Sequence, residues 1–213
     1  MKLICFPHYT CGGLLCDILN DTFSPIAPNK GIMNSQHALG NIGDIDTVNK
    51  DFSITKLISK LESIDTDNWI GTHCWPGQLP LDKFDCIICV TTSTWPSKLY
   101  RWLRVYHHYF SEQWSHLTGI ELVDKIRETA KNYHLPFEPV IASNTINLEF
   151  SEVVENTAEF QHVVRGHDIA QHIERWQSIN NFLYEKSLWH NYLVKAFYQA
   201  EVELNLQQFY RYE

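Results

Sequence analysis

The stretch LICFPHYTCGGLLCDILND, residues 3–21, sets out a strand, a glycine-containing loop and the start of a helix. Its apolar run ends at Pro7, which cannot donate a hydrogen bond to a strand ladder. Gly12 and Gly13 follow in the loop. Apolar residues then recur at helical spacing, namely Leu14, Leu15, Ile18 and Leu19. We therefore predict a buried strand over 2–6, a loop, and a helix that includes 14–19.

The loop between this strand and helix has features of an anion-binding site. The N–H groups and the dipole at a helix N-terminus attract phosphate without any charged side chain. Gly12 and Gly13 lack Cβ atoms and would allow an anion to approach closely. Thr10 and Tyr9 would add hydroxyl donors, and His8 would add a cation when protonated. A tight turn that binds nothing explains the two glycines equally well.

Strands and helices are expected to alternate along the rest of the chain. Strands are predicted over 68–75, 84–93, 139–143 and 145–150, with a short one near Ile32. Helices are predicted over 54–61, from Pro96 to about Phe110, over 119–133 and through the C-terminal region, with a break near Arg165 and Gly166. This alternation predicts a single α/β domain, residues 1–213, with a mostly parallel sheet between two helical layers. Ligands of such sheets bind beyond the carboxyl ends of the strands, so the loops after Phe6, Thr72 and Thr91 are expected to line one crevice.

Composition limits which partners the protein is expected to bind and in which compartment it is expected to reside. The formal net charge of −8 argues against indiscriminate binding to nucleic acid or to an anionic membrane. No apolar stretch approaches the ~20 residues of a membrane-spanning helix, and residues 1–6 are not expected to form a signal peptide. The cysteines lie mostly in apolar runs, where free thiols behave as small hydrophobes. We expect a reduced, cytoplasmic protein.

A metal site is not expected. Cys86 and Cys89 have the spacing of a zinc ribbon, but they lie in the strand-like run DCIICV. Side chains three positions apart on a strand point to opposite faces of the sheet. The pair is therefore poorly placed to chelate one ion, and no second pair completes a ligand set.

A longer segment carries a resemblance to a known family. The segment is THCWPGQLPLDKFDCIICVTTSTWPSKLYRWLRVYHHYF, residues 72–110. Its order of Thr72-His73, Pro76, Leu79-Pro80, an apolar strand and an aromatic helix resembles cytosolic sulfotransferases. The phosphosulfate loop of that family would fall on residues 7–13, and more permissive matches follow over 146–164 and 163–188.

The resemblance implies a sulfotransferase fold related to that of P-loop NTPases. It implies transfer of a sulfuryl group from 3'-phosphoadenosine 5'-phosphosulfate to a hydroxyl or amine of a small-molecule or glycan acceptor. His73 matches the family's catalytic base, a role that suits the near-neutral pKa of histidine. His8 takes the position of the lysine that stabilises the leaving oxygen. The remaining donor contacts would come from Tyr9, Thr10, Cys11, Gly12, Gly13, Thr92, Ser97, Arg101, Arg165 and Gly166.

The donor site also departs from the family pattern. The loop lysine is absent, and the arginine at the end of the strand corresponds to Thr91 or Thr92. A non-catalytic relative that binds a nucleotide or a protein partner is therefore a second hypothesis. Its partner surface would be the aromatic face of the helix, made of Trp95, Tyr100, Trp102, Tyr106 and Tyr109. A nucleotide kinase is disfavoured because Gly-x-x-x-x-Gly-Lys-Ser is missing.

Several of these residues also have purely structural explanations. His73 is equally compatible with a buried histidine bonded to a backbone carbonyl. Arg101 and Arg104 would supply the charge missing from the donor site, although a solvated helix face is a better explanation for Arg104 than for Arg101. A phosphate clamp and a surface arginine at a helix break explain Arg165 equally well. Cys11 is better explained by an inert thiol than by a nucleophile, because no histidine partner for it is evident from the sequence.

Overall fold

The computed structural model describes residues 1–7, 10–21, 67–73, 76–102 and 138–167, together with 104, 116–117, 121, 124–125, 128, 169 and 202. Its centre is a four-stranded parallel sheet in the order β2-β1-β3-β4. The strands are β1 (Lys2–Cys5), β2 (Trp69–Thr72), β3 (Cys86–Thr91) and β4 (Thr145–Glu149). The predicted α/β class with a parallel sheet is confirmed.

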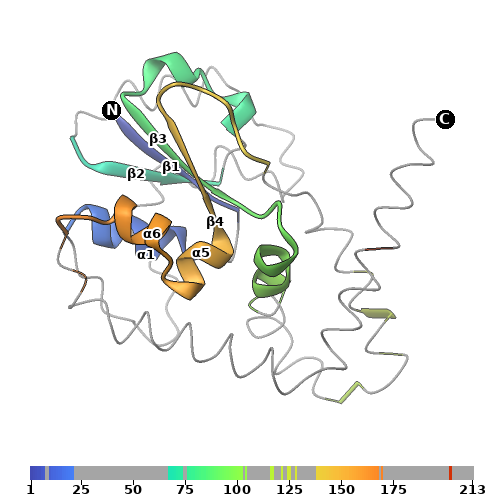
Figure 1. Cartoon of the computed structure of the whole chain (residues 1–213). Coiled ribbons are helices and arrows are strands. Elements are labelled where there is room, and N and C mark those ends of the chain that lie inside the picture. The colour runs from blue at the N-terminus through green and yellow to red at the C-terminus, as the bar shows by residue number, and fades with distance from the viewer. Residues whose placement is uncertain are drawn as a thin grey trace.

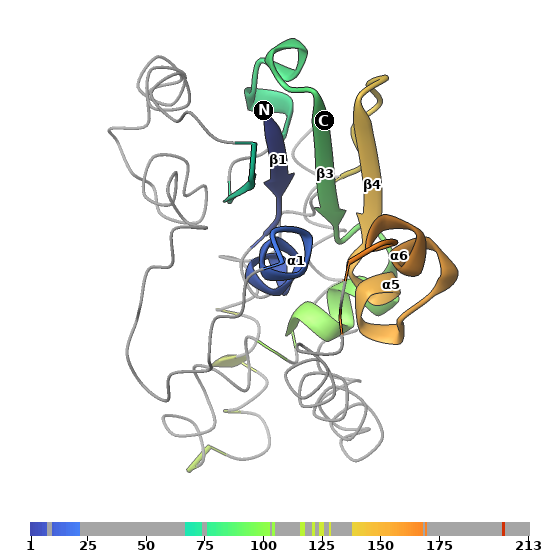
Figure 2. The ribbon, with the colours of Figure 1, turned by 90° about the vertical axis from the view of Figure 1, so that its left-hand side faces the viewer.

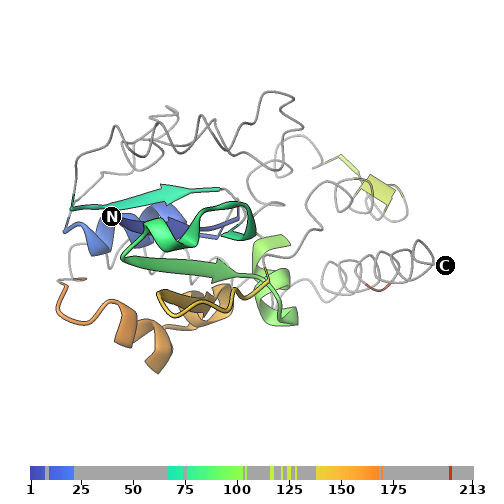
Figure 3. The same cartoon turned by 90° about the horizontal axis from the view of Figure 1, so that it is seen from above.

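Helices cover one face of this sheet. They are α1 (Gly12–Leu19), α5 (Phe150–Glu155) and α6 (Ala158–Val163), which group together in Figures 1 and 2. Two short 3₁₀ helices, η2 (Pro76–Gln78) and η3 (Leu81–Lys83), lie on the other side of the sheet (Figure 1). A further helix covers residues 95–102 and begins just beyond the end of β3 (Figure 3).

The alternation of side chains along β1 explains why its residues 3–5 are all apolar and buried. Ile4 and Phe6 belong to the core beneath α1, α5 and α6. Leu3 and Cys5 belong to a second core, which also contains Leu79 from the segment with the 3₁₀ helices. Strands that are buried on both faces read as continuous apolar runs, which is the pattern of β1 and β3.

The order of the strands reverses beside β1. The chain passes from β1 to β2 on one side and then crosses to β3 on the other side. In β1, Cys5 pairs with Thr72 of β2 and with Cys89 of β3, so the carboxyl ends of these strands lie at one edge. A reversal of this kind separates the loops that follow the two neighbouring strands, and α/β proteins bind ligands there.

Two of the remaining predictions are decided by the structure. The break near Arg165 is confirmed: α6 ends at Val163, and Gly166 has a φ of 89°. The strand predicted over 139–143 is wrong, because this segment has no regular structure and Ile141 is fully exposed. The backbone N–H and C=O of Val140 bond instead to the side-chain amide of Asn147, at 2.9 and 2.8 Å. The Asn147 side chain thus provides the hydrogen bonds that a neighbouring strand would otherwise give to Val140.

Other predicted elements are described only in part. The strand near Ile32 and the helix 54–61 lie outside the described residues, as does the helix beyond residue 104. Of the helix predicted over 119–133, residues 121, 124, 125 and 128 are described and are helical. Among all the residues that the structure describes, no helix has the length and apolar character required to cross a membrane.

Candidate functional site

The N-terminus of α1 lies at the carboxyl edge of β1. Cys11 precedes the helix in the left-handed region, with a φ of 61°, and its carbonyl accepts the first helical hydrogen bond from Leu15 at 3.1 Å. Within the described residues no side chain caps this helix, and its first turn contains no acidic residue. The first N–H groups of a helix have no partner inside the helix. The positive end of the α1 dipole is therefore not offset by a carboxylate of its own first turn.

Gly12 is required by packing at this position. A Cβ atom at residue 12 would lie 2.0–2.2 Å from ring atoms of Phe6, which is closer than any real contact. Thr10 is also engaged locally, since its hydroxyl donates to the carbonyl of Pro7 at 2.7 Å. The structure thus gives the glycine a reason that the sequence did not reveal: it makes room for an aromatic ring. His8 and Tyr9 lie outside the described residues.

His73 follows β2 and faces the end of β1. Its Nδ1 lies 2.9 Å from the carbonyl oxygen of Phe6, and its ring meets the Phe6 ring edge-on at a centroid distance of 4.5 Å. Because a carbonyl can only accept, Nδ1 must donate the hydrogen bond. In the neutral imidazole the lone pair is then on Nε2, which is the tautomer that a general base needs. The hydrogen bond to a backbone carbonyl therefore fits the structural explanation of His73 and also determines which ring nitrogen carries the proton.

Arg104 brings a cation to the start of α1. Its Nη1 donates to the Sγ of Cys11. The sequence offered Arg101 and Arg104 as sources of the charge missing from the donor site, and it favoured the alternative of a solvated helix face more for Arg104 than for Arg101. A signal was present, because Arg101 and Arg104 are three residues apart and share one face of the helix. Arg101 itself is buried.

The turn after β3 is occupied by a carboxylate of the protein itself. Oε1 of Glu149 accepts from the hydroxyls of Thr91, at 2.9 Å, and of Ser93, and from the amide of Ser93. Oε2 accepts from the amide and the hydroxyl of Thr94, at 3.4 and 3.1 Å. Burial alone would raise the pKa of Glu149, but the hydrogen bonds from the turn outweigh burial and lower this pKa. A fixed negative charge thus lies at the start of the helix over 95–102.

The residues predicted to bind a 3'-phosphate beside this turn are buried and engaged with the protein. The Oγ of Ser97 accepts from the amide of Ser151 at 2.9 Å and lies 3.1 Å from the hydroxyls of Ser151 and Thr94. Thr92 is buried as well. This part of the predicted donor site therefore holds β3, the following helix and α5 together.

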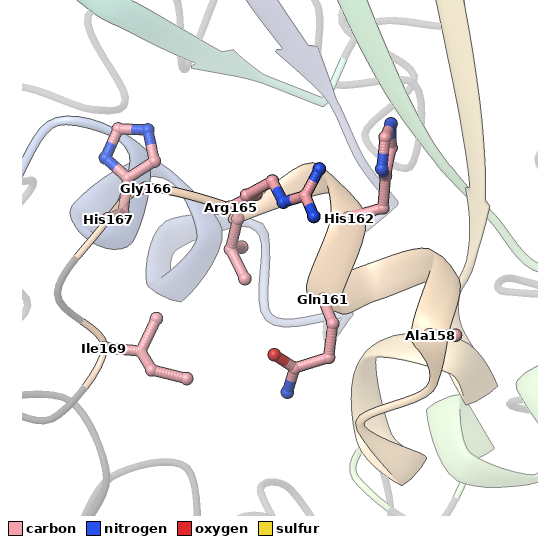
Figure 4. A pocket seen from close by; sticks show the side chains of 8 residues that line it. Ala158, Gln161, His162, Arg165, Gly166, His167 and Ile169 are labelled. Atoms are coloured by element: carbon pink, nitrogen blue, oxygen red, sulfur yellow. The ribbon is translucent and has the colours of Figure 1, made fainter.

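Arg165 and Gly166 lie away from the loop. His167, two residues after Arg165, contacts Asp21 just past the C-terminal end of α1, with 3.2 Å between Nδ1 and Oδ1. The loop is at the opposite end of this helix, about 12 Å away for a helix of eight residues. Arg165 and Gly166 instead line a cavity of about 610 Å³ formed by α6 and the turn after it (Figure 4). The structure does not bring them to the predicted phosphate loop.

The free cysteines of the described residues differ in their surroundings. Cys5, Cys16 and Cys89 are buried, whereas Cys11 and Cys86 are partly exposed. Burial raises the pKa of the Cys16 thiol, and Asp17 raises it further, so this thiol stays protonated. No group of three or more metal-ligating side chains is present within the described part of the chain.

Comparisons with protein families, curated proteins and solved structures return no match to this chain.

Proposed function

We propose that this protein binds a nucleoside phosphosulfate in the crevice between residues 10–13 and 91–94 and transfers its sulfuryl group to a hydroxyl or amine acceptor. The observation that carries the proposal is the contact between Arg104 and the N-terminus of α1. This contact places a guanidinium and helix N–H groups together at the point where the strand order reverses. Such a combination favours a phosphate or sulfate group.

The chemistry requires a proton acceptor and a group that stabilises the leaving phosphate. The acceptor oxygen or nitrogen forms a new bond to sulfur, and the bond between sulfur and the phosphate oxygen breaks. The leaving phosphate keeps the electron pair, and the N–H groups of α1 with Arg104 would stabilise its charge. Nε2 of His73 would take the proton of the acceptor. Arg104 would thus replace the loop lysine of the sulfotransferases that the sequence resembles.

The roles of His73 and Arg104 can be separated by kinetics and binding. In His73→Asn, the side-chain amide can still donate to the Phe6 carbonyl, but no base remains. We expect transfer to fall by roughly 10²–10⁴ with nucleotide affinity unchanged, measured by calorimetry and with labelled phosphosulfate. Arg104→Ala should weaken nucleotide binding, whereas Lys98→Ala on the same helix should not. Unaltered transfer in His73→Asn, or unaltered binding in Arg104→Ala, would contradict the assigned role.

A non-catalytic nucleotide-binding protein is the second candidate, and the carboxylate of Glu149 favours it. A site that has lost contacts to its donor can retain affinity without catalysing transfer. The aromatic helix is less suited to a partner, since Trp102 is buried and Tyr100 donates to Glu155 at 2.9 Å. Burial and this hydrogen bond raise the pKa of Tyr100 to about 12. Nucleotide binding without transfer, together with a silent His73→Asn, would select this candidate.

A further inference from the structure

We propose that the cavity formed by α6 and the turn after it binds a small organic anion, whose phosphate or carboxylate group is held by Arg165. This site is separate from the one proposed above. The turn contacts Asp21, just past the C-terminal end of α1, whereas the loop at 10–13 precedes the N-terminal end of that helix.

The cavity has the size and the mixed lining of a small-molecule site. Its volume of about 610 Å³ lies within the roughly 300–1,000 Å³ that is usual for ligand pockets. Such pockets combine an apolar wall with a few polar groups that orient the ligand. Here the wall contains three apolar side chains and four polar ones, namely Ala158, Val164 and Ile169, and Gln161, His162, Arg165 and His167.

The polar side chains of the wall suit an anion. Among the described residues that line the cavity there is one arginine and there are two histidines, but there is no carboxylate. In a protein with a formal net charge of −8, this is a local excess of cationic and donor groups. A guanidinium is always charged, and its planar fork of N–H groups matches two oxygens of a phosphate or a carboxylate. The apolar side chains can at the same time cover the carbon part of such a ligand.

Arg165 is available to bind the anion. Within the described part of the chain, its guanidinium forms no hydrogen bond or ion pair. The side chain extends towards His162 in Figure 4, and the two residues are three positions apart at the end of α6. Residues at this spacing are neighbours on a helix surface. An imidazole has at least one N–H donor in either protonation state, so the pair can donate to one anion together.

The turn after α6 places residues on both sides of Gly166 at the cavity. Gly166 has a φ of 89°, a conformation that glycine adopts at no steric cost. Arg165 and His167 therefore both line the cavity although the chain turns between them. Nδ1 of His167 lies 3.2 Å from Oδ1 of Asp21, and this contact joins the turn to the segment that follows α1.

Basic side chains at the end of a helix have a second use, because they stabilise the negative end of the helix dipole. That use requires neither a cavity nor a ligand. It predicts that replacing Arg165 changes the stability of the protein and has no effect on binding, so the two roles can be told apart.

The test uses two simple anions and a neutral molecule with the same ring. The isotope-labelled full chain is titrated with phenyl phosphate, benzoate or benzyl alcohol, each to about 10 mM, and amide NMR spectra are recorded. We expect at least one of the two anions to cause saturable shifts in residues 158–169, and the tighter of the two identifies the class of anion. Benzyl alcohol should bind at least about tenfold more weakly, because it lacks the charge.

Arg165→Gln removes the charge and keeps an amide donor, so it should weaken anion binding at least about tenfold. Lys83→Gln is the matched control, because it makes the same change of charge at an exposed position in η3, on the other side of the sheet (Figure 1). Its affinity should equal that of the wild type.

Three results would overturn the proposal. The first is the absence of shifts in residues 158–169 with both anions, and the second is equal binding of benzyl alcohol. The third is wild-type affinity in Arg165→Gln with only its thermal stability altered, which would assign the arginine to the helix dipole. The comparison of the three molecules on the wild type stands even where Arg165→Gln fails to fold.

Discussion

At the scale of single residues, Phe6 connects the end of β2 with the start of α1. Its amide donates to the carbonyl of Thr72 at 2.9 Å, its carbonyl accepts from His73, and its ring fills the space beside Gly12. The ring is almost fully buried, with 3% of its surface exposed. One side chain therefore sets both the start of α1 and the position of the imidazole.

This packing predicts a specific coupling between residues 6 and 12. Gly12→Ala forces a methyl group against the Phe6 ring, so we expect a loss of about 1–3 kcal/mol in the free energy of unfolding. In a Phe6→Leu background the clash is smaller, and the same substitution should cost less. Urea unfolding of the four proteins measures the coupling. Additive effects would show that the ring does not restrict residue 12.

The sequence pointed to Gly12 correctly, but for a different reason from the one that the structure shows. Gly12 was predicted to matter because an anion might approach it, whereas the structure shows that Phe6 occupies that space. For Arg104 the sequence left both a donor-site cation and a solvated helix face open, because the contact with Cys11 that decides between them spans 93 positions of the chain. Contacts between residues far apart in the chain depend on packing, which periodicity and motif spacing do not encode.

At the scale of elements, α1 and β2 are tied together by one side chain. Nδ2 of Asn20 donates to the carbonyl of Trp69 at 2.9 Å, and its Oδ1 accepts from the amide of Trp69 at 2.7 Å. The amide group of Asn20 thus pairs with the first residue of β2 as a neighbouring strand would. This contact joins the C-terminal end of α1 to the start of β2.

Asn20→Ala should destabilise the protein by about 1–3 kcal/mol, because it leaves two partly buried backbone groups without their partner. Asn147→Ala is the matched control. It removes the same two-bond arrangement from Val140, but that arrangement is exposed to water, so the expected cost is below about 1 kcal/mol. Thermal unfolding followed by circular dichroism compares the two. Equal losses would mean that burial does not set the strength of the Asn20 contact.

The elements themselves were largely predictable where a pattern was long or strongly apolar. β1 and β3 follow from apolar runs that contribute to both cores, and α1 follows from one that contributes to the core beneath the helices. The strand at 139–143 was predicted wrongly because a short apolar run does not reveal whether a neighbouring strand is available. Nor did any local signal predict that Glu149 would reach Ser93, 56 positions away in the chain.

At the scale of the whole molecule, the strand order determines where chemistry can occur. The order β2-β1-β3-β4 places the reversal between β1 and β3. Three contacts lie along the carboxyl edge: His73 with the end of β1, Arg104 with the start of α1, and Glu149 with the turn after β3. The sequence predicted this common edge from the alternation of strands and helices, but not the opposite charges at its two ends.

The most direct measurement is a crystal structure of the full chain grown with saturating adenosine 5'-monophosphate. We predict that the phosphate lies within hydrogen-bonding distance of the backbone amides of residues 11–13, with the guanidinium of Arg104 turned from Cys11 towards it. A nucleotide ordered elsewhere on the molecule, or a crevice without ligand density while Arg104 stays on Cys11, would contradict the account.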